Sequence, residues 1–142
     1  GIGDECKKIA LIGARLASEE RPANRYREVK HLGRITQTMV HNSLDAYARL
    51  DAGLAVTTAR CDRVVDEEYE AIQRQSITFM MEDSRMIRRA LDVMWVVRAL
   101  ERVGDHAKNV CEYVIYMVHG KDVRHTSLES VEQEIRGTKA RV

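Results

Sequence analysis

The feature that most constrains this chain is an apolar seam in its last third. Its members recur every three or four positions, the period of one face of an α-helix: Val93, Val97, Leu100, Gly104, Ala107, Cys111, Val114 and Val118. Two earlier segments, residues 23–52 and 54–83, carry the same period over similar lengths. Because strands alternate with a period of two, the pattern predicts an all-α protein.

Breaks in this periodicity divide the chain into three parts. Pro22, the only proline, separates a short helical segment from the long ones, and Gly53, Ser84 and Gly120 are the expected helix ends and cap. Three helices of near-equal length with short turns predict an antiparallel three-helix bundle over residues 21–120. Residues 1–20 are expected to contain the C-terminal part of a helix. Residues 121–142 are expected to be a polar tail, with a short helix over Ser127–Ile135.

A row of oxygen-bearing side chains lies beside the seam. Glu101, Asp105 and Asn109 are four residues apart, so they share one stripe of the predicted helix. Like charges at this spacing repel by a few tenths of a kcal/mol, and Gly104 costs about 1 kcal/mol relative to alanine. A bound hard cation, which prefers carboxylate and amide oxygens, would offset these costs.

Simpler interpretations compete with a metal site. The row could be a solvated acidic face paired with Arg98 and Arg102, although surface pairs stabilise little. A diiron carboxylate bundle needs Glu-x-x-His on two helices, whereas this chain has one such match, Glu28-x-x-His31. An oxygen-activating bundle is therefore disfavoured.

Two further patterns are interpreted as ordinary helix surface and core. A second acidic ladder at fourfold spacing has arginines nearby and is expected to be a solvated helix face; it consists of Asp62, Asp66 and Glu70. The methionines and the single tryptophan suggest either an adaptable partner surface or core filling, and core filling is favoured. These residues are Met80, Met81, Met86, Met94, Met117 and Trp95.

The acidic row has a second copy at the start of the chain. Ile2-Gly3-Asp4-Glu5-Cys6-Lys7-Lys8-Ile9 aligns with Val103-Gly104-Asp105-His106-Ala107-Lys108-Asn109-Val110. The alignment predicts an internal repeat of roughly a hundred residues. In that register the counterpart of Glu101 falls just before Gly1, so the first row is expected to be cut by an N-terminal truncation. Lys8 replaces Asn109 in this copy.

These segments resemble the PhoU family of phosphate-signalling proteins. The resemblance extends over about positions 1 to 125, and its most specific parts are the acidic row and the run Gly120-Lys121-Asp122-Val123-Arg124-His125. The run Met80-Met81-Glu82-Asp83-Ser84-Arg85 adds to it. Family members consist of two similar three-helix bundles, so this chain resembles the second bundle preceded by the end of the first.

The resemblance also implies a site. In the family a Glu-x-x-x-Asp row on one helix of each bundle binds metal clusters. By that resemblance Glu101 and Asp105 are expected to be metal ligands, with Asn109 as their neighbour and Asp4 as the remaining member of the first row. The expected cofactors are divalent or trivalent metal ions, with iron, zinc, magnesium and manganese as the candidates.

The implied function is negative regulation of phosphate uptake and phosphate-starvation signalling. PhoU-like proteins contact a sensor histidine kinase and the ATPase subunit of a phosphate ABC transporter, and a homodimer is expected. No Gly-rich phosphate loop, nucleophile elbow or Cys-x-x-Cys pair is present, so no enzyme activity is expected. A metal-dependent helical-bundle enzyme and a structural scaffold without metal are the alternatives.

Composition narrows the class of partner and the compartment. A net charge of +1 gives no footprint for nucleic acid. The odd number of cysteines, three within helical patterns, favours reduced thiols in the cytoplasm. No apolar run reaches the eighteen or so residues of a membrane span. The expected location is therefore the cytoplasm, including the inner face of the membrane, without membrane insertion.

Overall fold

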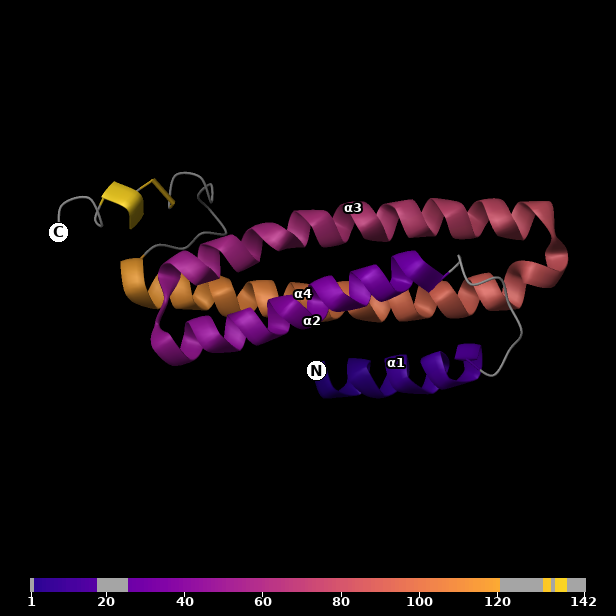
Figure 1. The fold of residues 1–142 in the computed structure, drawn as a ribbon, viewed down its shortest axis with the longest axis horizontal. Coiled ribbons are helices and arrows are strands. Elements are labelled where there is room, and N and C mark those ends of the chain that lie inside the picture. The colour runs from indigo at the N-terminus through magenta and orange to yellow at the C-terminus, as the bar shows by residue number, and fades with distance from the viewer. Residues whose placement is uncertain (1, 18–25, 121–131, 134, 138–142) are drawn as a thin grey trace.

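A computed structural model of the chain describes residues 2–17, 26–120, 132–133 and 135–137 (Figure 1). The element order is α1 (Ile2–Ala17), α2 (Arg27–Arg49), α3 (Ala52–Glu82), a 3-10 turn (Ser84–Met86) and α4 (Ile87–His119). Every regular element in these residues is helical, which confirms the predicted all-α class.

The long helices α2, α3 and α4 pack as an up-down-up bundle, as the sequence predicts (Figure 1). Helix α4 contacts all three other helices, whereas α1 contacts only α4 among the described elements. Figure 1 shows α1 lying along one side of α4, away from α2 and α3. Helix α4 is therefore the element that every other helix shares.

The apolar seam of α4 forms the core for most of its length. Val97, Leu100, Ala107, Cys111 and Val114 are each no more than 8% exposed, and they pack against buried residues of α2 and α3. The prediction is wrong at the last member, since Val118 is 42% exposed. This residue lies in the final turn of α4, just before Gly120 ends the helix.

The turn between α2 and α3 differs from the prediction that Gly53 ends the first long helix. Helix α2 ends at Arg49, and Leu50 adopts the left-handed conformation with φ 51° and ψ 42°. Asp51 then caps α3, because its carboxylate accepts a hydrogen bond from the Leu54 N–H at 3.0 Å. Gly53 lies inside the first turn of α3.

The other two helix boundaries lie close to their predicted positions. Asp83, rather than Ser84, is the cap, and it accepts a hydrogen bond from the Arg85 N–H at 3.0 Å. Ser84 instead opens the 3-10 turn that leads into α4. Gly120 ends α4 with φ 66°, the left-handed conformation that glycine adopts without strain.

The described part of residues 121–142 is helical and touches the bundle. Ile135 is 8% exposed and belongs to the apolar cluster that includes Ala55 and Cys111. Arg60 of α3 pairs with Glu132 at 2.5 Å. The helix expected over Ser127–Ile135 begins outside the described residues, and its described residues continue to Gly137.

Among the described residues, none of the helices combines the length and apolar character required to cross a bilayer.

Candidate metal site

Helix α4 presents the predicted acidic row on the side that faces α3. Glu101 is partly buried, while Asp105 and Asn109 are exposed. Gly104 lies between the two carboxylates, and a Cβ built on it would meet Val65 Cγ1 of α3 at 3.5 Å and Thr36 Cγ2 of α2 at 3.6 Å. The glycine therefore lies where three helices meet, and the row flanks this contact.

The second acidic ladder lies on α3, across from this row. Asp62 is only 8% exposed, and its Oδ2 lies 3.4 Å from Lys108 Nζ of α4. The interpretation of the ladder as a solvated helix face is therefore wrong at Asp62. Periodicity along one helix does not reveal which part of a stripe a neighbouring helix covers; here α4 covers Asp62, whereas Asp66 and Glu70 are exposed.

Burial and neighbouring negative charges both raise the pKa of carboxyl groups along the α3–α4 contact. Burial and the charges of Asp62, Asp105 and Glu70 raise the pKa of Asp66, and the Lys108 ammonium opposes this. Burial and the charges of Asp105, Asp66 and Asp62 likewise raise the pKa of Glu101, against a smaller opposite effect from Arg102. The four carboxylates of Asp62, Asp66, Glu101 and Asp105, hereafter the acidic groove, thus form one electrostatic unit.

Lys108 is the cation that the chain itself supplies to this groove. Partial burial works against its charge, but Asp62, Glu112 and Asp105 together raise its pKa. Its Nζ also lies 3.9 Å from Glu112 Oε1. One ammonium shared in this way leaves a net negative charge on the four carboxylates, so the groove still favours an added cation.

The carboxylate oxygens of the acidic groove are the right type of ligand for a hard cation, but their present spacing is not that of a complete site. Carboxylate oxygens are the preferred ligands of magnesium, calcium and manganese ions. However, no group of three or more His, Cys, Asp and Glu side chains within the described residues is placed to hold one ion together. Side chains of the groove would have to turn toward one another to form a complete ligand set.

The first copy of the motif has different surroundings. Asp4 and Gly3 of α1 are exposed, and nothing described lies within 4 Å of a Cβ built on Gly3. The adjacent Glu5 is 8% exposed and accepts a hydrogen bond from Arg102 Nη1 at 3.2 Å. Arg102 therefore pairs with Glu5 of α1. The interpretation of the acidic row as a solvated face expects Arg102 to pair with that row instead.

Core filling, the favoured interpretation of the methionines and the tryptophan, is wrong at three positions. Trp95 is 54% exposed, Met81 is 82% exposed and Met117 is 40% exposed. These three side chains lie on the outward faces of their helices, which their apolar character alone does not reveal.

The family model and two relatives that match this chain carry the same family description. A model of the PhoU domain matches residues 29–114. A phosphate-specific transport system accessory protein PhoU homolog of Pseudomonas putida is 47% identical over 137 residues, 96% of this chain and 54% of that protein. The accessory protein PhoU of Escherichia coli is 40% identical over 136 residues, 96% of this chain and 56% of the relative.

A solved structure with the same family description also has a similar fold. The crystal structure of PhoU from Pseudomonas aeruginosa matches with a TM-score of 0.79 at 47% identity, covering 84% of this chain and 57% of that one. The chain thus spans little more than half the length of these relatives.

Proposed function

This chain belongs to the PhoU family, and we propose that it takes part in the regulation of phosphate uptake and phosphate-starvation signalling. In this proposal it is a metal-binding helical adaptor between a phosphate ABC transporter and a sensor histidine kinase, and it acts negatively on the response. The names of its relatives support the link to phosphate transport. Their description as accessory proteins favours a regulator over an enzyme.

The observation that carries the metal part of the proposal is the acidic groove. Two helices each contribute a pair of carboxylates four residues apart, and burial together with the charges of neighbouring carboxylates raises the pKa of Asp66 and Glu101. Proteins usually separate such charges or pair them, because an uncompensated cluster costs stability. A cation of charge two or three would remove this cost and join α3 to α4.

Glu101 and Asp105 are the proposed ligands on α4, and Asp66 and Asp62 of α3 are the additional ligands that the fold supplies. Asn109 lies one turn beyond Asp105 on the same stripe, where its amide could orient a metal-bound water. Asp4 remains a candidate for a separate site on α1. A bound ion would supply charge neutralisation, and the residues of the chain would hold α3 and α4 in one arrangement.

Elemental analysis combined with thermal melting tests this site. Purified protein should bind manganese, zinc or iron, and Glu101→Ala with Asp105→Ala should lose the metal and melt at a lower temperature in its presence. Glu67→Ala with Glu82→Ala is the matched control, because both residues are exposed carboxylates of α3 outside the groove. Full metal content in the double variant of the groove would refute the ligand assignment.

Binding measurements test the adaptor role. The chain should bind the purified cytoplasmic part of the kinase and the ATPase subunit of the transporter, and a chelator should weaken both complexes. Hydrolysis of a phosphate ester by the metal-loaded chain would instead favour the enzyme alternative. Absence of binding to either protein, with metal present, would contradict an adaptor role for this part of the family fold.

A further inference from the structure

Lys108 of α4 pairs with the most enclosed carboxylate of the acidic groove. Its ammonium Nζ lies 3.4 Å from Asp62 Oδ2 of α3. The Lys108 side chain is 34% exposed, whereas the Asp62 side chain is only 11% exposed. Lys108 also belongs to the same helix as the proposed ligands Glu101 and Asp105. A cation of the chain itself is therefore already bound to one of the proposed metal ligands.

This ammonium competes with any ion that binds Asp62. Two cations at one carboxylate repel each other, so an incoming ion must displace Lys108 from Asp62. The electrostatic gain from the exchange comes from the charge that the ion carries in excess of the single charge of the ammonium. A monovalent ion gains nothing by this exchange, whereas a divalent or trivalent ion does.

Glu112 gives the ammonium a second partner outside the groove. Its Oε1 lies 3.9 Å from Lys108 Nζ, and the two residues are four positions apart on α4. Side chains at this spacing are neighbours on the helix surface, so their pairing needs no movement of the backbone. Lys108 can therefore leave Asp62 and stay paired with Glu112 by rotation of its side chain alone.

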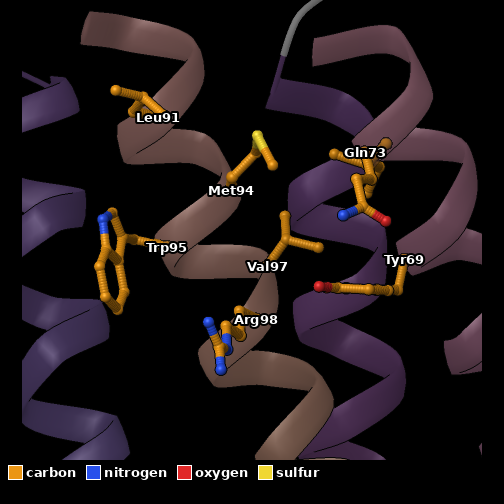
Figure 2. Close-up of a pocket in the computed structure, with 8 residues that line it drawn as sticks. Tyr69, Gln73, Leu91, Met94, Trp95, Val97 and Arg98 are labelled. Carbon is orange, nitrogen blue, oxygen red and sulfur yellow. The ribbon is translucent and has the colours of Figure 1, made fainter. Parts of the chain in front are cut away.

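The opposite end of the groove offers the ammonium no comparable partner. Beyond Asp66 and Glu101 the α3–α4 contact becomes a largely apolar pocket, in which Tyr69 faces Met94 and Val97 (Figure 2). None of the eight residues that line this pocket is acidic. A displaced ammonium is therefore directed toward Glu112.

We propose that Lys108 is a built-in competitor of the metal and restricts the acidic groove to ions of charge two or more. Without metal its ammonium pairs with Asp62, and when such an ion binds, it pairs with Glu112 alone. This inference rests on the proposed metal site. It adds that a residue of the same chain lowers the affinity of that site and sets its selectivity.

Calorimetric titration of the chain with manganese tests the competition. Lys108→Gln removes the charge, Lys108→Arg keeps it, and Lys30→Gln removes the charge of an exposed lysine of α2. Lys108→Gln should bind manganese about tenfold more tightly than the original chain, because the ion no longer displaces a cation. Lys108→Arg should stay closer to the original chain than Lys108→Gln, and Lys30→Gln should leave the affinity unchanged.

Glu112→Gln should change the affinity in the opposite direction. Without its second partner the ammonium stays with Asp62, so manganese should bind about two- to fivefold more weakly. The same substitution should have no such effect when Lys108 is already glutamine. Equal weakening in both backgrounds would show that Glu112 acts only through its own negative charge, and would overturn the exchange of partners.

Potassium tests the selectivity. Replacing tetramethylammonium chloride with potassium chloride at equal ionic strength should weaken manganese binding to Lys108→Gln, because potassium can then enter the groove. The original chain should show no such loss. Equal losses in the two proteins would overturn the role of Lys108 in excluding monovalent ions.

The proposed metal site and the competition by Lys108 fail in different ways. If manganese binds the original chain and Lys108→Gln equally, the metal site stands and the competition is wrong. Weaker binding to Lys108→Gln would likewise overturn the competition, because Lys108 would then support the site. If manganese binds neither protein, the metal site is wrong and the inference falls with it.

Discussion

The two copies of the Gly-Asp motif share a register but have different surroundings. In α4, Gly104 lies against Val65 and Thr36, and Asp105 belongs to a groove that α3 completes with Asp62 and Asp66. In α1, Gly3 has no described neighbour within 4 Å of a Cβ position, and α1 touches only α4 among the described helices.

This difference shows what turns a helical motif into a candidate site. A row of oxygen ligands on one helix can supply only part of the coordination of an ion such as calcium, which takes six to eight oxygens. A facing helix can add the others. The second copy has such a helix in α3, so substitutions should affect the two copies differently.

The largest difference should come from enlarging the two glycines. Gly104→Leu should destabilise the protein by about 2–3 kcal/mol, because Val65 and Thr36 leave room for little more than a methyl group. Gly3→Leu should be neutral or slightly stabilising, because its position is open and leucine favours helix. Chemical denaturation measures both.

Gly104→Ala is the conservative control for this pair. Its Cβ would make an ordinary contact at 3.5 Å, so the gain of up to about 1 kcal/mol in helix propensity should be largely retained. A Gly104→Leu variant as stable as Gly104→Ala would show that α2, α3 and α4 do not meet closely at this point.

A smaller difference in stability should separate alanine variants of Lys108 and Lys7, the two lysines that the repeat aligns. Lys108→Ala should cost about 1–3 kcal/mol without metal, since it leaves the buried Asp62 carboxylate without its ammonium partner. Lys7→Ala, on the exposed side of α1, should stay within about 0.5 kcal/mol of the original. Equal effects in urea denaturation would remove the distinction between the copies.

The smallest effect is a pH dependence at the second copy. Burial and neighbouring carboxylates raise the folded-state pKa values of Asp66 and Glu101, so their stabilising contribution is present at low pH and is lost as pH rises through those values. In a chelator, the melting temperature should therefore rise as the pH falls from neutral toward the ordinary values of 3.8 and 4.5.

Substitution isolates this contribution. Asp66→Asn with Glu101→Gln should flatten the pH dependence relative to the original chain. A pH profile that is identical in the two proteins would show that folding does not raise the pKa values of Asp66 and Glu101.

Much of this architecture follows from the sequence, because helix period and end signals are local. The seam from Val93 to Val114 and the end at Gly120 were predictable from spacing and residue type alone. Gly53 was misleading, since Leu50 adopts the left-handed conformation and Asp51 provides a cap that restarts the helix. Local residue preferences do not decide between two neighbouring stop signals.

The candidate site was predictable only on one of its two sides. Glu101 and Asp105 stood out through their spacing beside a glycine. Asp62 and Asp66 were interpreted as part of a solvated face, because the burial of Asp62 depends on the rotation of α3 against α4, which no single-helix pattern contains. The exposure of Trp95 was missed for the same reason.

Thermal melting of Asp66→Asn with Glu101→Gln against the original chain, in a chelator and then in excess manganese, tests the central claim most directly. The account predicts an inversion: without metal the neutralised variant melts at the higher temperature, because repulsion is relieved, and with manganese the original chain melts at the higher temperature, because only its groove binds the ion. If manganese leaves the order of the two melting temperatures unchanged, the acidic groove is not a metal site.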